Sequence, residues 1–343
     1  MRKFRLLIVA LLMGVVVGAL EGCNRRELLD PSFTTQMNVK VDIRSLANVT
    51  CDVYNEKIPL PVIEPEMMRV LFYKPGTNIV AGESYISAVS TDGDGNRVLS
   101  GAVGVIPGTY ELVIYNFDTR STMIRNDNSR ATIEAYTEPV VESIASRFNT
   151  RVDEATDILY QPDHLVVATN EREVIPYHEA VHTIEAVAES VVETFYIQIK
   201  VEGLEYVSSA QAVLTGMVGS NRFGLGERVT DKENAVYFTL VKSDDKGAPV
   251  LCNVFNTFGR IDGSKNDLWM TFDIHTIDGR VLTKEYDISH LFDTDDFKQH
   301  RWLLFEEVLV IPPPPPAPPG TSSGGGFEPS VNEWSEERHE VII

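Results

Sequence analysis

Two histidines four positions apart are the first residues of this sequence that suggest chemistry. His178-Glu179-Ala180-Val181-His182 matches the H-E-x-x-H pattern, which on a helix turns two imidazoles toward one zinc ion with the glutamate as general base. A zinc site also needs a third ligand. Glu202 lies at a distance that some zinc peptidases use, but residues 195–201 before it alternate in the manner of a strand. We therefore predict that His178 and His182 lie in extended chain and bind no metal.

An acidic loop is the second candidate. Asp92, Asp94 and Asn96 match the first three ligands of an EF-hand calcium loop. That loop needs Gly at its sixth position and Glu at its twelfth, where this sequence has Arg97 and Val103. The pattern predicts a hairpin turn instead. The sequence also has no nucleophile elbow, phosphate-binding loop or dinucleotide fingerprint, so we expect neither an enzyme nor a cofactor.

Cys23 suggests covalent chemistry of another kind. The run Leu20-Glu21-Gly22-Cys23 follows a basic start and the apolar stretch 6–20, which is shorter than the roughly 20 residues of a membrane-spanning helix. A small residue directly before a cysteine resembles the lipobox of bacterial lipoproteins, in which the cysteine is diacylated and becomes the new N-terminus. We predict a signal peptide at 1–22 and a covalent lipid such as palmitate on Cys23. The alternative is an ordinary signal peptide with a chance cysteine.

Charge and sorting signals narrow the partners. The formal net charge is -20, and loss of residues 1–22 removes three basic residues and one acidic residue, which gives -22. Such a chain repels nucleic acid and anionic headgroups, so its predicted membrane contact is the lipid. Asn24 stands where an Asp retains many lipoproteins in the inner membrane, which favours the outer membrane and exposure at the cell surface. Cys51 and Cys252 either pair in an oxidising envelope or remain two buried thiols.

Most of the mature chain has the alternation of β-strands. Residues 37–43 place apolar and polar side chains on opposite faces, and short runs of the same kind follow between Gly, Pro, Asp and Asn turns. The runs expected in the first half are 67–73, 85–89, 97–103, 110–115 and 165–169, and those in the second half are 195–201, 210–217, 235–241, 250–255, 268–274 and 280–286. Short helical turns are expected within 143–148 and 289–297.

One of these runs carries a detailed expectation. Tyr110, Leu112 and Ile114 are predicted on the core face, and Asn116 with Asp118 is predicted to cap the turn that follows.

The fold class predicted from these runs is all-β, with two tandem antiparallel β-sandwich domains. A tether at 23–36 would precede an N-terminal sandwich at 37–173 and a C-terminal sandwich at 174–311.

The C-terminal segment changes character. A linker at 312–326 begins with a stiff polyproline stretch and ends in flexible Gly and Ser. Residues 327–343 then end in apolar and β-branched side chains, which is unusual for a disordered tail. We predict a C-terminal strand that pairs either with the chain's own second sandwich or with another subunit. Its candidate pairing residues are Phe327, Trp334, Val341, Ile342 and Ile343.

Several short motifs together resemble a known family. Besides the lipobox and the Arg-Arg-Glu-Leu that follows it, they are Val70-Leu71-Phe72-Tyr73-Lys74-Pro75-Gly76, the block from Ile106 to Thr119, Gln161-Pro162-Asp163, Leu214-Thr215-Gly216-Met217 and Phe255-Asn256-Thr257-Phe258-Gly259. In this order they look like the fimbrillin-associated anchor lipoproteins and their uncharacterised relatives, over nearly the whole mature chain. The resemblance implies two transthyretin-like sandwiches, assembly with other fimbrial subunits by strand exchange, and no catalysis.

Three functional hypotheses follow. The leading one is a non-enzymatic outer-membrane lipoprotein that acts as a fimbrial or pilus anchor or as an adhesin-like subunit. The rival is a surface glycan-binding lipoprotein whose exposed aromatic residues, such as Trp269, Trp302 or Trp334, stack on sugars; an exposed aromatic cluster on a sandwich edge would favour it. The third is a zinc peptidase acting through His178 and His182, which requires both to meet on a helix.

Overall fold

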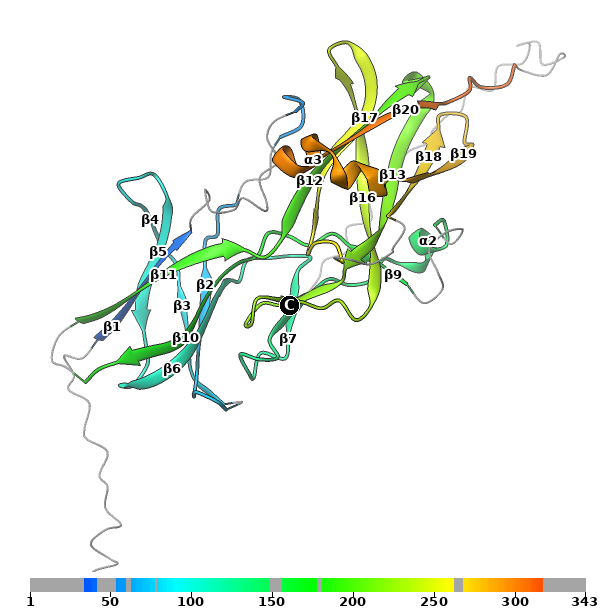
Figure 1. The fold of residues 1–343 in the computed structure, drawn as a ribbon. Coiled ribbons are helices and arrows are strands. Elements are labelled where there is room, and N and C mark those ends of the chain that lie inside the picture. The colour runs from blue at the N-terminus through cyan, green and yellow to red at the C-terminus, as the bar shows by residue number, and fades with distance from the viewer. Residues whose placement is uncertain are drawn as a thin grey trace, which may run out of the picture.

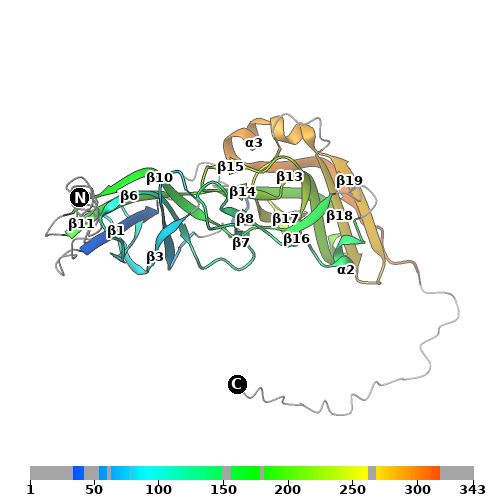
Figure 2. The same ribbon diagram turned by 90° about the horizontal axis from the view of Figure 1, so that it is seen from below.

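A computed structural model describes residues 34–41, 54–59, 63–77, 79–148, 156–177, 181–261 and 268–316 of the chain. The described chain is built almost entirely of β-strands (Figure 1). Two sandwiches lie end to end with a small sheet between them, and Figure 2 shows this elongated arrangement from below. The predicted all-β class with tandem sandwiches is confirmed.

The first sandwich is one ribbon of eight strands in the order β3-β2-β6-β10-β11-β1-β5-β4. β10 and β11 pair only at Val166↔Ser190 and Val167↔Glu189, so the ribbon opens there into two layers. The strands are β1 (Thr34–Val41), β2 (Met68–Tyr73), β3 (Val80–Ile86), β4 (Ala88–Thr91), β5 (Arg97–Val103), β6 (Gly108–Asn116), β10 (Val166–Ile175) and β11 (Val181–Ser190). The core between the layers includes Tyr110, Leu112 and Ile114, as their spacing predicted.

The second sandwich follows the order β19-β18-β13-β16-β17-β12-β20, with β9 added beside β16. β16 joins its two layers, because its first part pairs with β13 and its last part with β17. The strands are β9 (Asp157–Tyr160), β12 (Glu193–Glu202), β13 (Val207–Val218), β16 (Glu233–Asp245), β17 (Ala248–Thr257), β18 (Trp269–Thr276), β19 (Val281–Asp287) and β20 (Trp302–Val310). A large apolar core fills the space between the layers, with Phe238 and Phe255 stacked 4.0 Å apart between ring centroids.

A four-stranded sheet joins the two sandwiches. It contains β7 (Met123–Arg125), β8 (Glu134–Tyr136), β14 (Ser220–Arg222) and β15 (Glu227–Arg228). Side chains of this sheet, together with Phe223 directly after β14, pack on the outer face of β2 and β6, where Tyr115 lies 5.2 Å from Phe223 between ring centroids. Burial of this second apolar layer holds the sandwiches together, because each large side chain removed from water contributes roughly 1.5 to 3 kcal/mol.

The helices of the described residues are short. They are α2 (Glu142–Ala145), η2 (Leu204–Tyr206), η3 (Ser289–Asp293) and α3 (Asp295–His300). Three of them fall in or beside the two segments where helical turns were expected. The hydroxyl of Thr294 accepts a hydrogen bond from Phe297 N at 3.2 Å and so caps α3, which lies beside β20. Among the described residues, no helix has the length and apolarity needed to cross a membrane.

The course of the chain differs from the predicted division. β10 runs without a break through residues 173 and 174, and β11 returns to the first sandwich, so the chain changes sandwich at 191–192. Two strands from the first half of the sequence also pair with strands from the second half, because β8 pairs with β14 and β9 pairs with β16. β1 begins at Thr34, within the predicted tether. Alternation indicates that a segment is a strand, but it does not reveal the sheet that the strand joins.

Among the described strands, three pairs are parallel within otherwise antiparallel sheets. β1 is parallel to β11, β12 to β20, and β9 to β16. Each pair joins segments far apart in the sequence, which parallel pairing requires. β20 was not among the predicted strands, since its sequence mixes consecutive apolar residues with Glu306 and Glu307 instead of alternating.

Candidate anchoring strand and surface groove

β1 lies in the interior of its sheet although it is the first described strand. It pairs in parallel with β11 from Thr34↔Val181 to Val41↔Ala188. On its other side it pairs antiparallel with β5 from Thr35↔Val103 to Val41↔Arg97. Both backbone edges of β1 therefore have a partner strand over nearly its whole length. A pull along the strand from its N-terminal side would have to shear both ladders together, whereas an edge strand is held by one ladder only.

Only residues 24–33 separate Cys23 from β1 in the sequence. Cys23 itself lies outside the described residues, so the predicted lipid attachment stays a prediction.

The other end of the described chain leaves from a sheet edge. β20 pairs with β12 on one side, from Tyr196↔Trp302 to Glu202↔Val310. Ile311 N then donates to Glu202 O at 2.8 Å, and Arg280 Nη2 donates to Pro312 O at 2.8 Å. Gly203 has a φ of 84°, and a Cβ there would overlap the carbonyl oxygen of Ile311. The start of the proline-rich linker is thereby fixed at the end of the second sandwich.

The predicted pairing residues of the C-terminal strand lie beyond this point. Phe327, Trp334, Val341, Ile342 and Ile343 all lie outside the described residues. Their pairing stays a prediction.

Residues 54–59, which we call the strap, connect the first half of the chain to the second sandwich. Tyr54 Oη donates to Asp245 Oδ2 at 3.0 Å, and the Tyr54 ring meets Trp302 edge-on at 4.9 Å between centroids. Asn55 Nδ2 donates to Ser243 Oγ at 3.2 Å. These bonds hold the strap on the outer face of the second sandwich.

The strap covers an apolar patch. Ile58 is buried against Tyr196, Val250 and Cys252. Cys252 is a free, fully buried thiol whose pKa is raised by burial, so it is protonated and unreactive at neutral pH. Cys51 lies outside the described residues.

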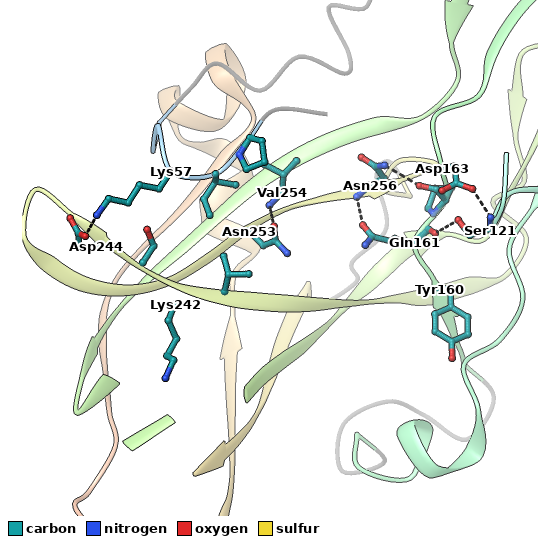
Figure 3. Close-up of a pocket in the computed structure, with 15 residues that line it drawn as sticks. Lys57, Ser121, Tyr160, Gln161, Asp163, Lys242, Asp244, Asn253, Val254 and Asn256 are labelled. Carbon is teal, nitrogen blue, oxygen red and sulfur yellow. Dashed lines mark hydrogen bonds and ion pairs between the residues drawn. The ribbon is translucent and has the colours of Figure 1, made fainter. Parts of the chain in front are cut away.

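A groove runs between the strap and residues 160–163 (Figure 3). Its floor is the outer side of β16 and β17, and its volume is about 1020 Å³. The lining residues are Lys57, Ile58, Pro59, Ser121, Tyr160, Gln161, Pro162, Asp163, Val241, Lys242, Ser243, Asp244, Asn253, Val254 and Asn256.

The polar groups of the groove bond mainly to the protein itself. Lys57 pairs with Asp244, and Lys242 Nζ donates to Val207 O at 2.7 Å. Asn256 N donates to the Gln161 side chain at 3.1 Å (Figure 3). Both lysines are thus bonded to other groups of the protein. The groove therefore resembles a contact surface more than a catalytic centre.

Asp163 and His164 organise the loop where the groove meets the first sandwich. The Asp163 carboxylate accepts the backbone N–H groups of Arg120, Ser121 and Thr122. Burial alone would raise the pKa of Asp163, but these bonds outweigh it and lower the pKa below the ordinary value. Burial lowers the pKa of His164 to about 4, so its ring is neutral at physiological pH.

The predicted cap after β6 is confirmed. Asn116 Nδ2 donates to Asp118 Oδ1 at 2.8 Å, and Asn116 Oδ1 accepts from Val166 N at 2.7 Å. The turn is thereby tied to the start of β10.

The apparent metal motifs have structural roles where the structure describes them. His182 lies in strand β11, as expected, with its Nε2 3.8 Å from Glu173 Oε1; His178 lies outside the described residues. Asp92 Oδ1 accepts from the backbone N–H groups of Asp94 and Asn96 at 2.9 and 2.8 Å, which builds the predicted hairpin turn between β4 and β5. Among the described residues, no cluster of three His, Cys, Asp or Glu side chains could hold a metal ion.

The two described tryptophans among those suggested as sugar platforms belong to different strands, β18 and β20. Trp302 is stacked on His300 at 4.3 Å between centroids and is also contacted by Tyr54. Trp269 belongs to β18, where its backbone N–H donates to Thr215 Oγ1 at 3.0 Å. Trp334 lies outside the described residues. A different aromatic pair, Tyr85 and Phe117, is exposed on the first sandwich, and sequence reasoning did not single it out.

A family model described as a domain of unknown function, DUF5119, matches residues 22–239. The chain is also 29% identical over 247 residues to a "putative fimbrium anchoring subunit", Fim4B, of Bacteroides ovatus. This match covers 72% of the chain and 64% of that relative's length. The resemblance to fimbrial anchor proteins is thereby confirmed.

A solved structure has a similar fold. The crystal structure of a "putative adhesin" from Bacteroides ovatus matches with a TM-score of 0.56 at 22% identity, over 86% of this chain and 98% of that one. The tandem-sandwich fold is therefore shared with a protein whose sequence has diverged widely.

Proposed function

The chain belongs to the DUF5119 family, and from this premise we propose that it is a non-enzymatic, lipid-anchored subunit that holds a fimbria at the outer membrane. The proposal takes its direction from the likeness to a relative described as a fimbrium anchoring subunit. More broadly, we propose that the chain has an adhesin-like role in the cell envelope.

The observation that supports anchoring best is the position of β1. A subunit at the base of a fibre transmits force between the fibre and the membrane. Here the strand nearest to Cys23 is paired on both sides, by β11 and β5. Shearing two ladders requires many backbone hydrogen bonds to break together, each worth about 0.5 to 1.5 kcal/mol net. The first sandwich is therefore suited to carry load that enters through a lipid on Cys23.

The opposite end suits attachment to a partner. The chain leaves the second sandwich beside Gly203 and Arg280, at the end away from β1 (Figure 2). A partner bound through residues 327–343 would then be joined to the second sandwich, whereas the predicted lipid is joined to the first. The proposed partners are other fimbrial subunits, joined by strand exchange, and the membrane through the lipid.

Metabolic labelling tests the lipid. Cells that produce the wild-type chain in the presence of labelled palmitate should carry label on the protein, and the protein should sediment with outer membranes. Cys23→Ala should remove the label and release the chain or leave its precursor unprocessed. Cys252→Ala serves as the matched control and should keep both properties. Label that survives Cys23→Ala would refute the proposed attachment.

A further inference from the structure

Two exposed aromatic rings touch one another on the first sandwich. Tyr85 and Phe117 are each 46% exposed, and their ring centroids are 5.5 Å apart at an angle of 63°. Among the described residues the other large exposed hydrophobic side chains are aliphatic, apart from Met123 and Tyr177. Exposed apolar side chains scattered singly need no explanation, whereas exposed apolar side chains in contact with one another are a place to look for a ligand.

Strand register explains why these rings gather. Arg69 of β2 lies opposite Tyr85 of β3 and opposite Tyr115 of β6. All three side chains are therefore in one cross-strand row, on the face opposite the sandwich core. Phe117 follows two positions after Tyr115 and joins the same face. Phe223, beside the small connecting sheet, packs on Tyr115 and helps to bury it. The rings of Tyr85 and Phe117 are not covered in this way and remain exposed.

Hydrogen bonds fix the platform in place. Tyr85 Oη donates to Glu83 Oε1 at 2.6 Å, and Phe117 N donates to Met67 O at 3.1 Å. The Arg69 guanidinium carbon lies 5.7 Å from the centroid of the Phe117 ring. Rings held in this way lose little conformational freedom when a ligand stacks on them, which favours binding.

A polar rim surrounds the rings. Arg69 donates from Nε to Glu83 Oε1 at 2.8 Å and from Nη1 to Asp127 Oδ2 at 2.8 Å. The side chains of Glu83 and Asp127 remain 39% and 43% exposed. Each carboxylate uses one oxygen in these bonds, and no described protein group donates to Glu83 Oε2 or Asp127 Oδ1. The rim thus offers acceptors directly beside two aromatic faces.

From this combination we propose that Tyr85, Phe117, Arg69, Glu83 and Asp127 form a binding site for a neutral sugar unit of a glycan. A pyranose presents C–H groups that pack on aromatic rings and neighbouring hydroxyls that donate to carboxylates. Two carboxylates against one guanidinium, on a chain of net charge -20, disfavour acidic sugars. This site is separate from the proposed anchoring function and does not depend on it.

A proline-rich peptide is the other ligand that exposed aromatic residues commonly receive. Proline rings would pack on Tyr85 and Phe117, but they have no hydroxyl groups to donate to Glu83 and Asp127. The rim therefore favours the sugar, and the experiment must distinguish sugar binding from peptide binding.

The test uses the full chain extracted in detergent and saturation-transfer NMR. The probes are neutral oligosaccharides of glucose, mannose, galactose, fucose and N-acetylglucosamine, with hyaluronan fragments and a decaproline peptide for comparison. We expect a neutral oligosaccharide to bind, and Tyr85→Ala and Phe117→Ala each to weaken binding by about tenfold. Phe117→Tyr should retain binding, as should Tyr177→Ala, which removes an exposed ring elsewhere.

Three results would overturn the proposal. They are binding of decaproline without any neutral sugar, sugar binding that persists in both alanine variants, and lack of neutral sugar binding up to about 10 mM. Thermal unfolding of each variant separates loss of the site from loss of the fold, and each alanine variant is expected to unfold in one transition with a melting temperature lowered by only a few degrees.

Discussion

The two ends of the described chain enter their sandwiches in opposite ways. β1 is inserted between β11 and β5, so both of its edges are paired. β20 is the last strand in its sheet and pairs on one side, with β12. Both strands are parallel to a neighbour that lies far away in sequence. The difference separates a strand that can resist force from a strand beside which another can be added.

This contrast suits an elongated subunit that connects two bodies. The end nearest to the predicted lipid is built into the interior of a sheet, and the end that leads to residues 317–343 leaves from a sheet edge. The strap adds a second connection, since it runs from the part of the chain that follows β1 to the outer face of the second sandwich. Each of these features can be disturbed separately.

Proline substitution should distinguish the two strands most strongly. Each N–H of β1 faces β11 or β5, so Val39→Pro removes a hydrogen bond inside a sheet and should lower the free energy of unfolding by on the order of 3 kcal/mol. Val310→Pro is the matched control. Because Ile311 N points to β12, the neighbouring N–H of Val310 points away from it, and that variant should unfold almost like the wild type. Chemical denaturation measures both, and equal losses would contradict the contrast.

Deletion of residues 327–343 tests the exit from the second sandwich. A strand that returns to its own sheet buries Phe327, Trp334 and the final apolar triplet, each large side chain contributing roughly 1.5 to 3 kcal/mol before the cost of ordering. The deletion should then lower the melting temperature. A strand donated to another subunit predicts an intact monomer that no longer assembles. If neither stability nor assembly changed, and the segment exchanged its amide hydrogens as fast as a free peptide, the predicted strand would not exist.

Acid should weaken the loop between the sandwiches. The pKa of His164 falls from 6.5 to about 4 on folding, because burial disfavours the charged ring. Its contribution is therefore complete above pH 6.5 and is lost as the pH falls toward 4, by up to about 3 kcal/mol.

His164→Gln isolates this effect, since glutamine does not titrate. The free energy of unfolding of that variant should fall less steeply than that of the wild type between pH 6.5 and 4. Parallel curves for wild type and His164→Gln would show that His164 does not titrate as described.

The strap should give the smallest effect. Tyr54→Ala removes the edge-on contact with Trp302 and the hydrogen bond to Asp245, so we expect a loss of about 1 to 2 kcal/mol. Lys57→Ala removes only an ion pair between exposed groups and should leave stability unchanged. Urea unfolding of both variants checks this order, and a larger loss for Lys57→Ala would contradict it.

Strand positions were largely readable from the sequence, but strand partners were not. β5 coincides with the predicted run 97–103, and β6 includes the run 110–115 with its core face and cap as expected. Alternation and turn residues act over a few neighbouring positions, which makes such segments recognisable. β20 was not predicted because its apolar residues do not alternate with polar ones. The assignment of β11 to the first sandwich depends on its pairing with β1, and the local sequence of β11 does not reveal this partner.

The candidate sites divide in the same way. The turn at Asp92 and the extended chain at His182 followed from spacing and flanking pattern, and both were found. The strap and the exposed pair of Tyr85 and Phe117 depend on which surfaces the fold leaves uncovered. Tyr85 was placed in a strand, but its neighbour across the sheet, Arg69, became visible only through the register. Side-chain clusters made by long-range pairing require the structure.

The most direct test of the account measures where the fimbriae are. Cells that produce the wild-type chain should keep their fimbriae attached, whereas cells with Cys23→Ala at the same expression level should release intact fimbriae into the medium. Electron microscopy of the cells together with immunoblots of the supernatant gives the ratio of attached to released fimbriae. Fimbriae that stay on cells carrying Cys23→Ala in wild-type amounts would contradict the proposal that this chain anchors them through its lipid.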